Sequence, residues 1–211
     1  MQVISHRGCW HEPAEKNTIP AFERSFRFGF GTETDFRDHS GRLVISHDLP
    51  VGDLLDGEVF FRTIAEYDRR LPLALNIKAD GLQSLLQLAL ARYKIENYFL
   101  FDMSVPDAMY SLKQNLRVFT RHSDVEPIPA FYTQAAGVWM DVFFDETWFK
   151  PSVIADHLQA GKQVCLVSPE LHKRPHIPFW EHLRAHPVHH SDQLILCSDL
   201  PETAAEFFSC E

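Results

Sequence analysis

Short apolar runs alternate with segments of helical periodicity along most of the chain. The runs are rich in Val, Ile, Leu and Phe, which is typical of strands buried in a parallel sheet. There are eight of them, at residues 2–5, 31–36, 73–78, 98–102, 116–120, 137–143, 163–168 and 193–198. Eight strands alternating with helices predict an α/β protein, a single-domain (β/α)8 TIM-type barrel over residues 1–211. An open doubly wound sheet is the alternative, although no glycine-rich fingerprint follows the first strand.

Three segments show the spacing of amphipathic helices, with apolar residues recurring every three to four positions. They are residues 17–26, 80–93 and 151–161. Asn17 or Thr18 can cap the first helix, and Asp80 can cap the second. A fourth segment, residues 57–70, is either an ordinary connecting helix or a short lid over a substrate pocket.

The composition narrows the class of protein. The chain has 211 residues, of which 45% are hydrophobic and 23% charged, as in ordinary globular proteins. Its formal net charge of −9 disfavours nucleic-acid binding, which needs a basic face. No apolar run approaches the roughly 20 residues of a membrane span, and the N-terminus shows no signal-peptide pattern. Nothing in the sequence indicates an oligomeric state.

The spacing of the cysteines indicates the cellular compartment in which the protein folds. Cys9, Cys165, Cys197 and Cys210 are scattered singly, without a C-x-x-C pair. This spacing argues against a zinc ribbon and against a disulfide scaffold. We therefore expect a protein of the reducing cytoplasm.

Two carboxylates stand at the end of the second expected strand. Because side chains alternate along a strand, Glu33 and Asp35 should share one face. Carboxylates held side by side repel each other unless one is protonated or a cation bridges them, and Mg²⁺ or Ca²⁺ prefers such oxygen ligands. A polar strand face that merely meets water is the alternative.

Histidines accompany these carboxylates. His6, Arg7 and Gly8 follow the first expected strand and supply an imidazole, a guanidinium and a residue that permits a tight turn. His47 and Asp48 follow another apolar run. Two histidines near a metal and an arginine can serve as general base and general acid in displacement at phosphorus.

The motifs HRG, NTIPAF, ETDFR and GRLVISHD together resemble the glycerophosphodiester phosphodiesterase family, part of the phosphatidylinositol-phospholipase-C-like barrels. The resemblance is dense over residues 3–50 and continues to about residue 80. It implies a (β/α)8 barrel that hydrolyses a phosphodiester with a divalent metal. By motif position it implies that His6 and His47 are an acid/base pair. It likewise implies that Glu33 and Asp35 are metal ligands and that Arg7 and Lys78 contact the phosphate.

The chain departs from the family pattern at three places. Lys16 stands before Asn17 where the family has glutamate, and Glu15 is displaced by one position. Asn76 stands where a third carboxylate is expected. Its carbonyl oxygen can still coordinate Mg²⁺ or Ca²⁺, but it carries no charge, so affinity for the metal should fall. No obvious insertion forms a lid.

Weaker candidates lie near other strand ends. They are Asp102, Arg121, Asp141, Glu170 and Trp139. Glu170 could supply the charge that is missing at Asn76, or it could pair with Lys173 or Arg174 in a loop. Trp139 either forms a pocket wall or packs in the interior.

The leading hypothesis is a metal-dependent phosphodiester hydrolase with a small glycerophosphodiester-like substrate and histidine acid/base catalysis. A cyclic product and a monoester product are both open. The alternative is a catalytically inactive barrel that binds a phosphorylated small molecule. A metal-dependent lyase or aldolase that uses the same carboxylates and Lys78 is a third, weaker hypothesis.

Overall fold

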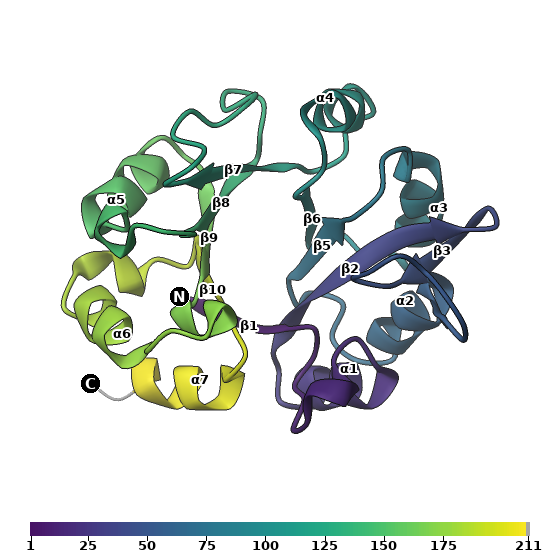
Figure 1. Ribbon diagram of the computed structural model, residues 1–211, viewed down its shortest axis with the longest axis horizontal. Helices are drawn as coiled ribbons and strands as arrows, with labels where there is room; N and C mark the ends of the chain where they lie inside the picture. The colour runs from purple at the N-terminus through teal and green to yellow at the C-terminus, as the bar shows by residue number, and fades with distance from the viewer. Residues whose placement is uncertain (210–211) are drawn as a thin grey trace. The chain divides into compact units, whose positions relative to one another are not determined.

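The computed structural model describes residues 1–209, so Cys210 lies outside the described residues (Figure 1). Its contacts divide the chain into two compact units. The N-terminal unit is residues 5–118, and the C-terminal unit combines residues 1–4 with the chain from residue 119 onward. The single-domain organisation over residues 1–211 stays a prediction.

The N-terminal unit alternates strands and helices. Its elements are the end of β1 (Gln2–His6), η1 (Pro13–Glu15), α1 (Ile19–Arg27), β2 (Gly31–His39), β3 (Arg42–Ile45), β4 (Leu55–Asp56), α2 (Gly57–Ala65), β5 (Leu73–Ile77), α3 (Gln83–Tyr93), β6 (Tyr98–Phe101) and α4 (Val105–Lys113). Strand β5 pairs in parallel with β2 on one side and with β6 on the other. Strand β1 lies beside β2.

A hairpin extends β2 beyond its expected end. Ser40 and Gly41 have φ of 52° and 76°, and two successive left-handed residues make the tight turn that joins antiparallel strands. Residues 36–39 of β2 consequently pair antiparallel with β3, which in turn pairs with β4. These two short antiparallel strands were not among the eight expected ones.

Helix α2 belongs to the core of the N-terminal unit. Phe60 and Phe61 are fully buried and pack edge to face against each other at 5.3 Å. Phe36 of β2 stacks on Phe61 at 5.4 Å. Residues 57–65 are therefore a connecting helix rather than a lid, because their aromatic side chains are committed to the interior.

The helix caps differ in part from expectation. The residue before α3 is Leu82, with no side-chain cap, and Asp80 instead accepts a hydrogen bond from Ser104 Oγ. The Asp80 cap was therefore wrong, because α3 begins three residues later. Thr18 precedes α1 as expected, but its hydroxyl donates to the Glu15 carbonyl rather than capping the helix.

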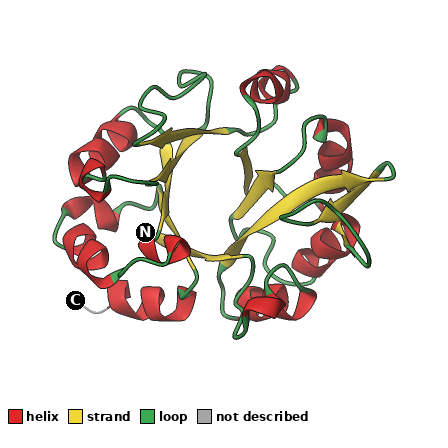
Figure 2. Ribbon diagram, in the orientation of Figure 1, coloured by secondary structure: helices red, strands yellow, loops and turns green. Residues whose placement is uncertain are grey.

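The C-terminal unit is a parallel sheet with helices. Its elements are β7 (Phe119–Ser123), β8 (Gly137–Asp141), η2 (Glu146–Trp148), α5 (Pro151–Gln159), β9 (Gln163–Val167), η3 (Pro169–His172), α6 (Ile177–Arg184), η4 (Pro187–His190), β10 (Leu194–Ser198) and α7 (Pro201–Ser209). Strands β7, β8, β9 and β10 pair in parallel in that order. Helices α5, α6 and α7 lie on one side of strands β8 to β10 (Figure 2).

Strand β7 begins later than residues 116–120 would place it. Helix α4 ends through Asn115, whose φ is 60°, and Leu116 N still bonds to the Ser111 carbonyl. The chain is therefore free to extend only after this helix end, and the strand starts at Phe119.

Alternate residues of the C-terminal sheet face the helices. Met140 and Leu166 pack in one buried cluster with Ile154 of α5 and Trp180 of α6. Asp141 therefore lies on the opposite face of β8 from Met140. Among the described residues, no helix combines the length and apolar character that a membrane crossing requires.

Candidate functional site

The turn after strand β1 is fixed onto strand β2. Arg7 and Gly8 have φ of 61° and 86°, in the left-handed region. A Cβ atom on Gly8 would lie 2.7 Å from the Cβ of Ala21, so the turn requires glycine. Arg7 N donates to the Glu33 carbonyl at 3.0 Å, and Gly8 N donates to Thr32 Oγ1 at 3.0 Å. The HRG motif is thereby held against the strand that carries the carboxylates.

Glu33 and Asp35 lie on one buried face of β2, with exposed fractions of 1% and 0%. His6 Nε2 lies 3.8 Å from Glu33 Oε2. Arg7 Nε lies 2.9 Å from Asp35 Oδ2. The structure thus brings together the carboxylate pair, the first histidine and the arginine of the motif.

Strand β5 contributes the next two candidates. Its parallel register places Asn76 opposite Asp35. Lys78 follows the strand, and its Nζ lies 3.6 Å from Asp35 Oδ1 and 3.3 Å from Asp102 Oδ2. Asp102, a weaker candidate from the sequence, therefore contacts the site through the lysine. Lys78 and Arg7 flank the two oxygens of a single carboxylate.

Burial sets the charges of this cluster. Burial, together with the neighbouring Asp35 charge, raises the pKa of Glu33 to about 8, although Arg7 and Lys78 oppose the shift. The pKa of Lys78 is lowered overall, because the effect of burial exceeds the opposing effect of the Asp35 and Glu33 charges. Without a further cation, Glu33 consequently holds a proton at neutral pH.

Three buried oxygens of the cluster have no hydrogen-bond donor. They are Glu33 Oε2, Asp35 Oδ1 and Asn76 Oδ1. Buried polar atoms normally find a partner, so three unsatisfied oxygens on adjacent strands call for a ligand. Carboxylate and amide oxygens are the donors that Mg²⁺ and Ca²⁺ prefer. The donor chemistry therefore fits the expected cation.

The asparagine limits this match. Within residues 1–209, no group of three or more His, Cys, Asp or Glu side chains is arranged to hold a metal ion. Asn76 supplies an oxygen but no charge, so only two of the three unsatisfied oxygens belong to carboxylates.

His47 lies on the loop after β3. Its side chain is 47% exposed, and Nδ1 lies 2.9 Å from Asp48 Oδ1. The preceding Ser46 N donates to the Asp35 carbonyl at 3.0 Å. The backbone of this loop is thus attached to the strand that carries the carboxylates.

Arg37 connects two candidate site residues. Its Nη2 donates to the His47 carbonyl at 3.0 Å, and its Nη1 donates to the Lys78 carbonyl at 2.7 Å. This role of Arg37 was not predicted from the sequence. The available signal was strand parity, since residues 33, 35 and 37 share one face of β2.

Asn17 is a second residue of the cluster that was not predicted as a site residue from the sequence, where it was expected to cap a helix. Its Nδ2 donates to Asp35 Oδ2 at 2.9 Å, and its Oδ1 accepts from Thr34 Oγ1 at 2.9 Å. The displaced Glu15 instead pairs with Arg24 and accepts a bond from His11 N. Its position at the start of the NTIPAF motif could have indicated that Asn17 belongs to the site.

Glu170 lies after β9 with both carboxylate oxygens bonded. Ser198 Oγ donates to Oε1 and Ser168 Oγ to Oε2, each at 2.5 Å, and Asp199 N donates to Oε1 at 3.2 Å. The alternative pairing of Glu170 with Arg174 is wrong, because Arg174 pairs with Glu146. A metal-binding role for Glu170 stays a prediction.

The remaining weak candidates also belong to the C-terminal unit. Trp139 is 6% exposed on β8. Arg121 Nε lies 3.0 Å from Glu126 Oε2. Asp141 Oδ1 lies 2.7 Å from His172 Nε2. The functional roles of these three residues stay predictions.

The chain is similar in fold to several solved structures. A glycerophosphodiester phosphodiesterase from Parabacteroides distasonis has a TM-score of 0.73 at 15% identity, with 99% of this chain and 96% of that chain covered. A phosphodiesterase from Oleispira antarctica, solved with the product sn-glycerol-3-phosphate, has a TM-score of 0.67 at 14% identity, covering 99% and 97%. A Ca²⁺-dependent phosphatidylinositol-specific phospholipase C from Streptomyces antibioticus has a TM-score of 0.59 at 9% identity, covering 98% and 96%.

These similarities define the class of fold. The chain has the α/β fold of a (β/α)8 barrel, as its strand pattern predicted. The solved structures that it resembles include several glycerophosphodiester phosphodiesterases, which confirms the resemblance indicated by the motifs. No protein-family model matches the sequence, and no curated protein matches it.

Proposed function

We propose that this protein is a metal-dependent phosphodiester hydrolase acting on a small glycerophosphodiester-like molecule. The observation that carries the proposal is the set of three buried oxygens without donors, on Glu33, Asp35 and Asn76. Arg7 and Lys78 lie against the same carboxylate cluster. The similar structures support this proposal because they include several named phosphodiesterases, one of them in complex with sn-glycerol-3-phosphate.

Glu33, Asp35 and Asn76 would hold the cation. When bound, a divalent ion polarises a phosphoryl oxygen and neutralises charge that develops during displacement. The Ca²⁺ dependence of the similar phospholipase C favours Ca²⁺, with Mg²⁺ as the other candidate.

Arg7 and Lys78 bind the phosphodiester in this proposal. Both are cations already placed beside Asp35, and both can donate hydrogen bonds to phosphoryl oxygens. Since negative charge spreads over those oxygens in the transition state, the two side chains stabilise it more strongly than they stabilise the ground state.

His6 and His47 transfer the protons. One imidazole accepts the proton of the attacking hydroxyl as its oxygen bonds to phosphorus, and the other protonates the ester oxygen as the second bond breaks. Attack by water gives a monoester, and attack by a neighbouring substrate hydroxyl gives a cyclic phosphodiester.

A second candidate function is a binder of phosphorylated small molecules without turnover. It is favoured by the uncharged Asn76 and by the two cations that already offset Asp35. In this case Arg7 and Lys78 would hold a phosphate group while the cluster stays free of metal.

Calorimetric titration of metal-stripped protein with Mg²⁺, Ca²⁺ and Mn²⁺ separates these functions. We expect one bound ion, loss of binding in Glu33→Gln, and about tenfold tighter binding in Asn76→Asp, which restores a charged ligand. Hydrolysis of glycerophosphocholine would then be measured with the ion that binds. The binder is correct if the ester binds without metal and without turnover, and both functions fail if neither ion nor ester binds.

The buried thiols suit a reducing compartment. The side chains of Cys9, Cys165 and Cys197 are buried. We therefore place the proposed activity in the cytoplasm, with a small-molecule phosphodiester as the partner.

A further inference from the structure

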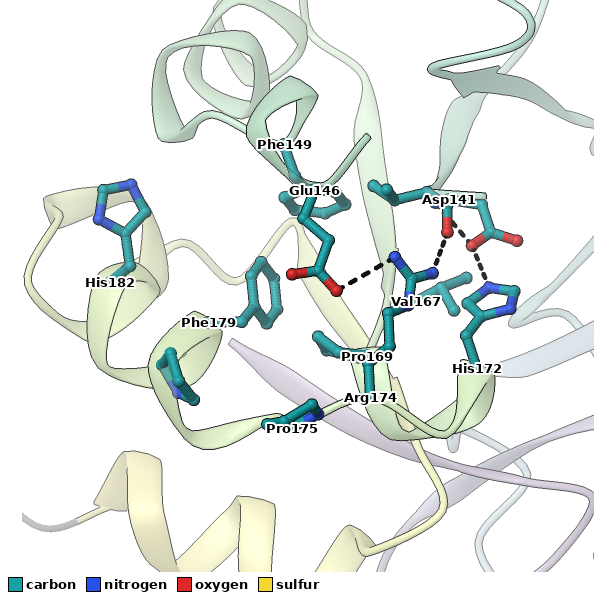
Figure 3. Close-up of a pocket in the computed structure, with 12 residues that line it drawn as sticks. Asp141, Glu146, Phe149, Val167, Pro169, His172, Arg174, Pro175, Phe179 and His182 are labelled. Carbon is teal, nitrogen blue, oxygen red and sulfur yellow. Dashed lines mark hydrogen bonds and ion pairs between the residues drawn. The ribbon is translucent and has the colours of Figure 1, made fainter. Parts of the chain in front are cut away.

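The C-terminal unit contains a cavity of about 330 Å³ (Figure 3). Residues that follow β8 and β9 line it together with helix α6. Its apolar wall is formed by Val142, Phe149, Val167, Pro169, Pro178 and Phe179. Cavities of this size hold small organic molecules. None of the lining residues belongs to the proposed phosphodiesterase site.

Two aromatic rings form one side of the cavity. Phe149 and Phe179 meet edge to face at 4.8 Å, with an angle of 89° between their planes. Phe149 is buried and Phe179 partly buried. Such a pair offers a ring face and a ring edge to a flat apolar group, which suits an aromatic body.

Arg174 is the fixed cation of the cavity. Its side chain is 21% exposed, and its Nη2 donates to the Val142 carbonyl on the cavity wall. Its Nη1 lies 3.3 Å from Glu146 Oε1, and Glu146 is 63% exposed. Glu146 faces Arg174 across the cavity (Figure 3). The glutamate can therefore rotate into water, whereas the arginine remains anchored to the backbone.

The second carboxylate of the cavity, that of Asp141, already has hydrogen-bond partners within the protein. Asp141 Oδ1 lies 2.7 Å from His172 Nε2 and accepts a bond from Val142 N at 2.7 Å. These two bonds hold Asp141 in place inside the protein. The carboxylate that an anion in the cavity would displace is therefore that of Glu146, and the cation it would meet is the anchored guanidinium of Arg174.

We propose that this cavity binds a small organic anion, in which a carboxylate or phosphate group is attached to an aromatic or compact apolar body. The anionic group replaces Glu146 on Arg174, because a guanidinium pairs in two-point fashion with either kind of oxyanion. The apolar body lies against Phe149 and Phe179. The proposal does not rest on the phosphodiesterase activity, since it uses other residues.

Ligand titration followed by NMR tests the proposal with phenylacetate and phenyl phosphate as probes. Benzyl alcohol controls for the ring alone, and inorganic phosphate controls for the anion alone. For a probe of about ten non-hydrogen atoms we expect a Kd on the order of 1 mM. Both controls should bind at least about tenfold more weakly. The tighter of the two probes identifies the anionic group.

Two substitutions locate the site. Arg174→Gln should weaken phenylacetate or phenyl phosphate binding by about 10-fold or more. The matched control is Arg92→Gln, because Arg92 also pairs with a glutamate, Glu58, at 2.9 Å. This control should leave probe binding unchanged.

Glu146→Gln supplies a variant that is expected to fold, because the side chain is exposed. Removal of the competing carboxylate should tighten binding of the anionic probe several-fold. The proposal is overturned if neither probe binds to the Glu146→Gln protein, or if binding survives Arg174→Gln unchanged. It is also overturned if benzyl alcohol binds as tightly as the anions.

Discussion

The two units differ in how they treat carboxylates at the ends of their strands. In the N-terminal unit, Glu33 and Asp35 are buried with one oxygen each that receives no hydrogen bond. In the C-terminal unit, Glu170 accepts bonds from two serine hydroxyls and a backbone amide. Asp141 is bonded to His172 and to a backbone amide.

This difference distinguishes carboxylates that can bind a ligand from carboxylates that only stabilise the fold. A carboxylate with both oxygens bonded, such as that of Glu170, stabilises the fold and has little capacity left for a ligand. A buried carboxylate with a free oxygen destabilises the fold until a ligand binds. Substitutions should accordingly affect mainly activity in the first group and mainly stability in the second.

The largest effect is expected at the two histidines of the N-terminal unit. His6→Ala and His47→Ala should each lower turnover of a glycerophosphodiester by about 10²-fold or more, because each removes a proposed proton-transfer group. His39→Ala is the matched control, since His39 lies exposed at the end of the same strand, β2. Turnover within a few-fold of the unmutated protein would remove that histidine from the mechanism.

Arg37 should have the next largest effect, as a positioning residue. Arg37→Met removes the bonds to the His47 and Lys78 carbonyls, and we expect kcat to fall by about tenfold. Arg37→Lys should recover part of the loss, and the pH profile should keep its shape because no titrating group is removed. Arg42→Met is the control, since Arg42 is exposed on the neighbouring strand. An unchanged kcat in Arg37→Met would exclude this role.

A pair of glutamate substitutions compares the two units directly. Glu170→Gln should lower the free energy of unfolding by about 1–3 kcal/mol, because a charged acceptor of three bonds is lost. Glu33→Gln should instead stabilise metal-free protein. The folded state holds the Glu33 proton up to a pKa of about 8, whereas the unfolded state releases it near the ordinary 4.5.

The sign of the Glu33 effect follows from proton linkage. Between these pH values the folded state binds more protons, so the unmutated protein loses stability as the pH rises. The advantage of Glu33→Gln should therefore grow from pH 5 to pH 8 and then level off. Urea unfolding in the presence of a chelator measures it. Equal destabilisation by both glutamine variants would contradict the distinction between the units.

The smallest effect concerns a buried histidine of the C-terminal unit. Burial, with a contribution from His122, lowers the pKa of His157 to about 4 from its ordinary 6.5, while Asp156 opposes the shift. His157 bonds to His122 and Tyr132, at 2.9 Å each. Since only the unfolded state takes up the proton between these values, stability should fall as the pH drops from about 6.5 to about 4.

His157→Gln tests this dependence. The slope of unfolding free energy against pH should become shallower between pH 4 and 6.5, by an amount on the order of 1 kcal/mol across the range. His39→Gln should leave the slope unchanged because that side chain is exposed. An identical slope in both variants would show that His157 titrates normally.

Much of the N-terminal unit could be predicted from local sequence patterns. Alternation along residues 31–36 correctly placed Glu33 and Asp35 on one face of the strand. The HRG motif indicated a turn, and Gly8 has the left-handed φ that such a turn needs. These features depend on neighbours within a few residues, so periodicity and residue type were sufficient.

Contacts between distant residues were decided only by the tertiary structure. Glu170 is bonded to Ser198, 28 positions away, and Arg37 reaches the Lys78 carbonyl, 41 positions away. Asp80 was expected to cap a helix but accepts from Ser104. The sequence by itself determined the eight expected strands, but not β3 and β4, and it determined which side chains share a face, because those properties follow from local geometry. Whether a buried oxygen accepts a hydrogen bond depends on donors from distant parts of the chain. Those donors come within about 3 Å of the oxygen only when the chain folds.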